Sequence, residues 1–278
     1  MAQQSVSVKR YIKEFYRRVM DDGVFDLSAQ LAYYFLLSLF PLLIFAFALM
    51  SYIDLSVDQV LDMIRRYAPP EAFDVLKETL KSVAGKQHGG LLSVGVLATV
   101  WTASNAINAM IRALNRAYNV EESRPFYISR GLSILLTLAM IVVIIIALIL
   151  PVFGELIGDF IFSRLGIDSD LRVAFVVLRW LFSFVVIVAV ISGLYYFAPN
   201  KKLRFKDVVT GAVTAAVGWQ VISLGFSYYV SSFGHYEVTY GGIGGIIILM
   251  IWFYLTGAIL IIGGEINAVN WYFENKRR

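Results

Sequence analysis

Six stretches of the sequence are apolar over lengths that match the hydrocarbon core of a bilayer. They are residues 30–52, 91–113, 131–154, 173–198, 207–232 and 241–270. A membrane-spanning helix needs roughly 20 apolar residues. An open sheet cannot cross lipid, because its edge groups would have no hydrogen-bond partners there. The sequence therefore predicts an all-α membrane protein with six transmembrane helices, organised as a single polytopic domain over residues 1–278.

The composition excludes the other broad classes of protein. Hydrophobic residues make up 59% of the 278 residues and charged residues only 16%, whereas a soluble domain has about 25% charged residues. A disordered chain is excluded by the same figures. The sequence contains no cysteine, so disulfides and thiolate metal sites are also excluded.

The basic residues predict how the chain is oriented in the membrane. Of 24 Lys and Arg residues, 16 lie in the N-terminal segment, the loops after the second and fourth spans, and the C-terminus, and 7 lie on the opposite side. Cytoplasmic loops carry the excess of Lys and Arg, so both termini are predicted to be cytoplasmic. This topology accounts for the net charge of +4, and no nucleic-acid partner is expected.

Two segments outside the spans also have helical patterns. Residues 5–29 place apolar side chains at helical spacing, with Lys and Arg on the other face. This predicts a cytoplasmic interfacial amphipathic helix, lying on the membrane or packed against the bundle. Residues 53–90 carry two apolar stripes separated by Pro69 and Pro70, which predicts an extracytoplasmic helical hairpin between the first two spans.

The second span carries a polar face. Trp101, Asn105, Asn108, Arg112 and Asn115 follow one another at steps of four, three, four and three, so they share one side of the helix. Lipid cannot satisfy these side chains, and they must face protein or water. They either line a cavity or hold the bundle together by interhelical hydrogen bonds.

Polar residues of two other spans are expected to meet this face. In the first span they are Gln30, Tyr34 and Ser38, one turn before the kink expected at Pro41. In the sixth span Glu265 is predicted at the depth of Arg112, with Asn267 nearby. We expect these groups to form a cytoplasm-facing polar cavity that binds substrate, with a conformational clasp between Arg112 and Glu265 as the alternative.

Arg179 is a second charged residue predicted inside the membrane, near the outer leaflet. An arginine at this depth is costly unless it is paired or reaches the interface. Glu155 is the first expected partner and Glu237 the second. The alternative is that Arg179 binds a lipid phosphate.

Small residues mark two places of close helix packing or hinge motion. They are Gly211, Ala215 and Gly218 in the fifth span, and Gly241, Gly242, Gly244 and Gly245 at the start of the sixth. Such faces let helices approach closely, and they also allow a homo-oligomer. The glycine run lacks the Lys-Ser/Thr ending of a phosphate loop, so nucleotide binding is not expected.

Several of these motifs together resemble the YihY/BrkB family. The similar segments are the stretch from Gln30 to Pro41, the stretch from Trp101 to Phe126, and Tyr240-Gly241 with Trp252 and Gly264-Glu265-Ile266-Asn267. The resemblance implies a bacterial inner-membrane protein with six helices. Members of that family carry labels such as virulence factor, an older label as a ribonuclease, and a suggested link to lipid movement.

Cleavage of RNA would need clustered carboxylates or histidines for metals, or a placed histidine. The acidic clusters on the predicted cytoplasmic side are Asp21-Asp22-Asp26 and Glu121-Glu122, and both histidines lie on the other side, so no catalytic residue, metal or cofactor is expected. We predict a transporter or flippase-like protein that handles a lipid or another amphipathic or anionic substrate, with membrane lipids as its partners. The alternatives are a non-catalytic scaffold for envelope integrity and, third, a membrane-embedded hydrolase.

Overall fold

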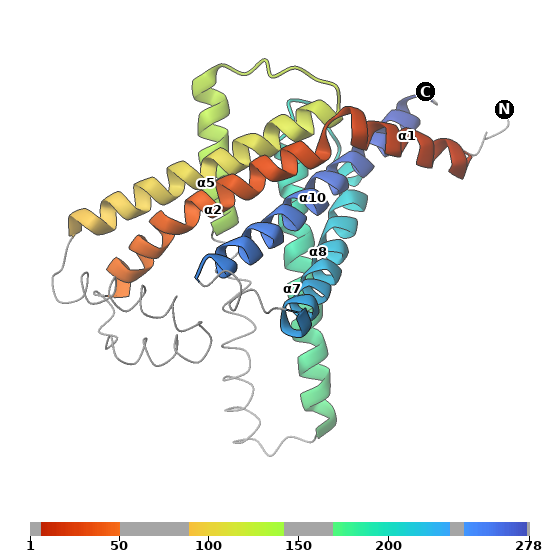
Figure 1. Cartoon of the computed structure of the whole chain (residues 1–278). Coiled ribbons are helices and arrows are strands. Elements are labelled where there is room, and N and C mark those ends of the chain that lie inside the picture. The colour runs from red at the N-terminus through yellow and green to blue at the C-terminus, as the bar shows by residue number, and fades with distance from the viewer. Residues whose placement is uncertain (1–6, 51–88, 142–168, 234–241, 277–278) are drawn as a thin grey trace. The chain divides into compact units, whose positions relative to one another are not determined.

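The computed structural model describes residues 7–50, 89–141, 169–233 and 242–276, and within these ranges the chain forms helices and no strand. The helices follow one another from red to blue in Figure 1. They are α1 (Val8–Asp21), α2 (Val24–Met50), α5 (Gly89–Ala117), α7 (Ser169–Phe197), α8 (Lys206–Phe233) and α10 (Gly242–Asn275), and a further helix spans Phe126–Ile141.

Three of these helices are long and apolar enough to cross a membrane. They comprise Ser93–Ala117, Lys206–Val230 and Gly244–Asn275, which match the second, fifth and sixth predicted spans. The apolar helices Val24–Leu39, Phe126–Ile141 and Leu181–Phe197 are shorter within the described residues. The six-span topology and the cytoplasmic placement of both termini stay predictions.

The N-terminal segment differs from the single helix expected over residues 5–29. Helix α1 ends at Asp21, and Gly23 has a φ of 66°. Glycine adopts this left-handed conformation without the steric cost that a Cβ atom brings. The chain turns there, and α2 begins at Val24 rather than at residue 30.

The chain packs as two units. One unit, which we call the terminal unit, comprises Met1–Phe25, Met110–Gln220 and Ala258–Arg278; the second comprises Asp26–Ala109 and Val221–Gly257. In the second unit, Phe35 packs on Phe253 with ring centroids 5.5 Å apart. Gly257 lies so close to Leu31 that an added Cβ would be 3.2 Å from the Leu31 Cβ.

In the terminal unit, α8 and α10 approach closely through small residues. A Cβ atom added to Gly211 would overlap the backbone oxygen of Gly263, and one added to Gly218 would lie 2.5 Å from Ile259. A Cβ on Gly263 would lie 2.9 Å from Ala215. Small residues that let helix backbones approach are the usual basis of tight packing between membrane helices.

Candidate functional site

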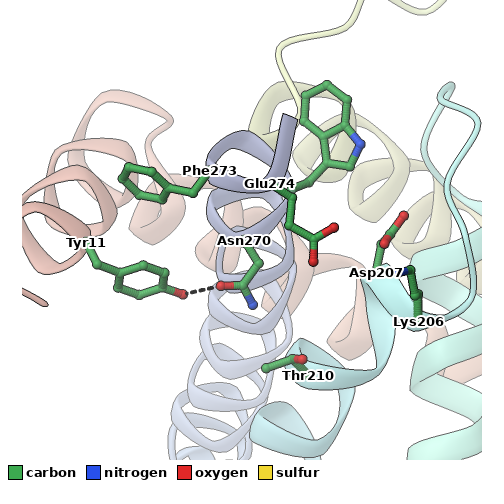
Figure 2. A pocket seen from close by; sticks show the side chains of 8 residues that line it. Tyr11, Lys206, Asp207, Thr210, Asn270, Phe273 and Glu274 are labelled. Atoms are coloured by element: carbon green, nitrogen blue, oxygen red, sulfur yellow. Dashed lines mark hydrogen bonds between the residues drawn. The ribbon is translucent and has the colours of Figure 1, made fainter. Parts of the chain in front are cut away.

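A pocket of about 250 Å³ lies in the terminal unit, where α8 begins and α10 ends. Figure 2 shows side chains from α1, α8 and α10 around it. Its lining residues are Tyr11, Lys206, Asp207, Thr210, Asn270, Trp271, Phe273 and Glu274. Since α8 and α10 both contain membrane-length apolar segments, the pocket lies at the polar end of two candidate spans.

One wall of the pocket is charged, and its two carboxylates are already paired. Arg204, just before α8, donates to Asp207 at 2.8 Å and to Glu274 at 2.9 Å. Its backbone N–H also donates to Asp207 at 3.0 Å, which fixes the start of α8. The Lys206 ammonium makes no hydrogen bond within the described part of the chain. The Lys206 ammonium can therefore donate hydrogen bonds to a ligand in this pocket.

Another part of the pocket wall is aromatic. The Tyr11 hydroxyl donates to Asn270 Oδ1 at 2.9 Å, as the dashed line in Figure 2 shows. The Tyr11 ring stacks on Phe273 with centroids 6.0 Å apart. Trp271 carries Lys201 Nζ over its ring, 3.5 Å from the centroid. Aromatic groups with a polar tip are enriched where a surface is apolar on one side and wet on the other.

A second polar cluster joins the end of α5 to the end of α7 through Asn115. Asn115 is buried; its amide donates to Glu122 at 2.9 Å, and its oxygen accepts from the Asn200 backbone N–H at 2.6 Å. Arg124 binds Glu122 at 2.7 Å and the backbone oxygen of Ala198 at 2.8 Å. Because these hydrogen bonds use both ends of the Asn115 amide, the cluster is a structural tie.

Glu265, in α10, is a fully buried carboxylate in the terminal unit. Its side chain is 0% exposed, and neither carboxylate oxygen has a hydrogen-bond partner within the described residues. Three charged groups surround it: Asp22, Arg18 and Arg116. Burial raises the pKa of the Asp22 carboxyl. A buried carboxylate without a hydrogen-bond donor is costly, and such groups in membrane proteins are typically functional.

Charged groups that depth along the helix does not predict also act on Glu265. Arg112 and Arg116, which lies one turn further along α5, are both exposed, and the charge of Arg116 acts on Glu265 from a distance. The rise per residue of a straight helix gives the depth of a residue but not the direction of its side chain. The sequence therefore does not distinguish Arg112 from Arg116 as a partner of Glu265. The clasp between Arg112 and Glu265 stays a prediction, and the charges of Asp22, Arg18 and Arg116 act on Glu265 in the structure.

Asn267 was expected to bind substrate, and its amide is engaged with α8. It is fully buried, accepts from the Gly211 backbone N–H at 2.7 Å, and donates to the Val208 backbone oxygen at 2.9 Å. Both ends of the amide are thus used inside the protein. This geometry favours a packing role for Asn267 rather than contact with a ligand.

The other predicted cavity residues belong to the second unit. The Ser38 hydroxyl donates back to the Phe35 carbonyl at 2.7 Å. Trp101 is 57% exposed. Gln30, Tyr34, Asn105 and Asn108 are half-buried. Pro41 lies inside α2, which continues through it. The cavity that would combine these residues with the terminal unit stays a prediction.

Several predicted residues lie outside what the structure describes. These are Glu155, Glu237, Gly241 and the hairpin over residues 53–90, together with the side chain of Arg179. The pairing proposed for Arg179 therefore stays a prediction. The other glycines of this run are described. Gly242 and Gly244 lie in the first turn of α10. A Cβ atom added to Gly245 would meet no atom within 4 Å.

The sequence pattern does not indicate Asp22, Arg18 and Arg116 as groups that act on Glu265, nor Lys206, Asp207 and Glu274 as pocket residues. A signal for Asp22 was present, because Asp-Gly is a common break between elements and Asp22-Gly23 interrupts a helical pattern. The pocket residues of α10 also share helical spacing at Asn270, Phe273 and Glu274.

The fold and this site define an all-helical integral membrane protein with a polar, aromatic-lined pocket at one end of its membrane-length helices. Comparison with family models assigns residues 15–278 to the family described as virulence factor BrkB. The chain belongs to this family.

Individual relatives agree with this assignment. The chain is 48% identical to the ribonuclease-like protein YfkH of Bacillus subtilis, over 93% of this chain and 94% of the relative. It is 28% identical to a UPF0761 membrane protein of Aliivibrio salmonicida, over 91% of this chain and 80% of the relative. For a UPF0761 membrane protein of Vibrio vulnificus the identity is 29%, over 96% and 83%. No solved structure matches the chain.

Proposed function

We propose that this protein is a transporter or flippase-like protein for a phosphate-bearing amphiphile, with a membrane lipid as the substrate class. The observation that carries the proposal is the pocket at the ends of α8 and α10. Its charged wall and its aromatic wall face one small space, which matches a molecule that has a polar head and an apolar body.

The size and chemistry of the pocket suit a headgroup. Pockets that enclose whole drug-sized ligands measure roughly 300–1,000 Å³, and this one is about 250 Å³. The acyl chains would therefore stay in the bilayer. The Lys206 ammonium supplies up to three donors for a phosphate oxygen, while Arg204 holds Asp207 and Glu274 so that they repel an anion less.

The predicted topology indicates on which side of the membrane the pocket lies. With both termini cytoplasmic, the pocket faces the inner leaflet, because it is built from α1 and the last turns of α10. We propose this lipid chemistry rather than the ribonuclease activity suggested by the name of the Bacillus relative.

A scaffold role is the second candidate, and one observation favours it. Two of the polar residues that face the helix bundle, Asn115 and Asn267, have both ends of their amides bonded inside the protein. Such bonds hold helices together and need no ligand. A scaffold predicts that the pocket is not occupied and that the pocket lysine is dispensable.

The test is native mass spectrometry of the full chain, released gently from bacterial membranes. We expect a co-purified phospholipid on the wild type and at least a several-fold lower bound fraction for Lys206→Ala. Lys202→Ala is the matched control, because Lys202 is an exposed lysine on the same segment and does not line the pocket. Equal lipid retention by both variants, or no lipid on the wild type, would contradict the proposal.

A further inference from the structure

The buried carboxylate of Glu265 is the strongest feature that the pocket does not use. Glu265 is 0% exposed, and both of its oxygens lack a hydrogen-bond partner among the described residues. A carboxylate has about four acceptor positions, and leaving them empty in the interior costs several kcal/mol in general. Among the described residues, no hydrogen-bond donor satisfies this group, so a bound species is expected to do so.

The two arginines near Glu265 do not supply it. Arg18 donates to Glu14 at 3.0 Å and to the Ala117 carbonyl at 2.8 Å, and it lies over the Tyr272 ring. Arg116 is exposed, and its guanidinium donates to the backbone oxygen of Asp21 at 3.5 Å. Both guanidinium groups act on Glu265 from a distance, while their hydrogen bonds go elsewhere.

A second carboxyl, that of Asp22, interacts with the Glu265 side chain. Asp22 faces Glu265 closely enough for one proton between them to complete a hydrogen bond. Asp22 is held there by the end of α1, where its N–H donates to the Arg18 carbonyl at 2.8 Å and Gly23 makes the turn. Two carboxyl groups in such contact cannot both ionise cheaply, and they hold one proton as a pair.

We propose that Asp22 and Glu265 form a proton-binding site in which a single proton is shared between one oxygen of each carboxyl. When bound, the proton converts one of two facing acceptors into a donor. When it is released, two carboxylates face each other in a partly dry environment, and the end of α1 is pushed away from α10. No bond other than those to this proton is made or broken.

A proton fits this pair better than a metal ion does. Hard cations such as Ca²⁺ and Mg²⁺ take about six or more oxygen ligands. Within the described residues no group of three or more His, Cys, Asp or Glu side chains comes together as a metal site. Two carboxyl groups are sufficient for a shared proton.

Every element packed against Glu265 contributes to the charge around this proton. The groups concerned are Arg18, Asp21 and Asp22 from α1, Arg116 from α5, Tyr118 just after α5, and Tyr195 from α7. The Tyr195 hydroxyl donates to the Leu260 carbonyl, so it does not serve the carboxylate. If the proposed transport is correct, release of the proton is the step that couples a proton gradient to movement of α1.

Infrared spectroscopy of the full-length protein tests the site itself. At pH 6, roughly two units above an ordinary carboxyl pKa, we expect the wild type to retain the carbonyl band of a protonated carboxylic acid. Glu265→Gln and Asp22→Asn each replace the shared proton with an amide N–H donor of similar shape, and the band should be lost in both. Asp21→Asn is the control, because Asp21 is exposed, and it should keep the band.

Thermal unfolding against pH gives a second readout. A group that binds its proton more tightly in the folded state contributes stability at low pH and loses it as the pH rises. The wild-type melting temperature should therefore fall above neutral pH, while Glu265→Gln should be flatter. A wild type without the acid band, or stabilisation that requires sodium instead of protons, would overturn the proposal. Lipid retention by native mass spectrometry is a separate measurement, so failure of the proton site and failure of lipid binding are distinguishable.

Discussion

The contact between α8 and α10 makes Gly211 the position where one added methyl group should do the most damage. A Cβ at Gly211 would overlap the Gly263 carbonyl oxygen and come within 2.5 Å of the Asn267 amide nitrogen. The first neighbour is backbone and cannot rotate away, so Gly211→Ala must separate the two helices. Separation also breaks both Asn267 hydrogen bonds to α8.

The expected loss follows from these contacts. Overpacking costs about 1–3 kcal/mol, two buried hydrogen bonds contribute about 1 kcal/mol each, and alanine in a helix recovers up to about 1 kcal/mol relative to glycine. Gly211→Ala should therefore destabilise the protein by about 2–4 kcal/mol on the basis of these terms. Gly225→Ala, in the same helix, meets no atom within 4 Å and should be neutral or slightly stabilising.

The assay is equilibrium unfolding of the purified protein in mixed micelles, with an increasing fraction of denaturing detergent and tryptophan fluorescence as the signal. Adding Asn267→Ala to Gly211→Ala should rescue only part of the loss, because the overlap with the Gly263 oxygen remains. If Gly211→Ala and Gly225→Ala unfold at the same detergent fraction, the close approach of α8 and α10 is refuted.

Three further predictions concern the terminal unit. Gly23→Ala should lower the melting temperature, since a left-handed φ costs a residue with a Cβ roughly 1–2 kcal/mol, whereas Gly131→Ala, which meets open space, should not. Arg17, which donates to Glu14 at 2.7 Å, and Arg18 together lower the Glu14 pKa from 4.5 to about 2. The small stability that these ion pairs add above pH 4.5 should vanish as the pH falls toward 2, and Glu14→Gln should remove that dependence in thermal melts. Asn115→Ala should speed hydrogen exchange in residues 119–124, and unchanged exchange would contradict its role as a tie.

Regular periodicity and long apolar runs are what the sequence reveals best. Within the described residues the apolar stretches form helices, and Gly211, Ala215 and Gly218 lie in a helix with close neighbours at Gly211 and Gly218. Both properties depend on residue type and spacing along one element. The break at Gly23 was missed because a single glycine interrupts an otherwise continuous amphipathic pattern, and its φ is set by the packing on either side.

The candidate site was harder to predict because it depends on direction and not only on depth. Arg112 and Arg116 lie one turn apart on α5, and the sequence does not indicate that the charge of Arg116 acts on Glu265. The pocket brings Tyr11, Lys206 and Glu274 together from segments far apart in the chain. No local pattern predicts such a meeting, although the buried acid at Glu265 could be singled out from its place in an apolar span.

Movement of lipid between leaflets is the central claim, and one reconstitution tests it most directly. Vesicles that contain the full-length protein and a trace of phospholipid with a fluorescent headgroup are exposed to a membrane-impermeant quencher, and the inner-leaflet fluorescence is followed over time. We predict faster loss with the wild type and with Lys202→Ala than with Lys206→Ala or protein-free vesicles. Wild-type vesicles that lose fluorescence no faster than protein-free ones would contradict the account.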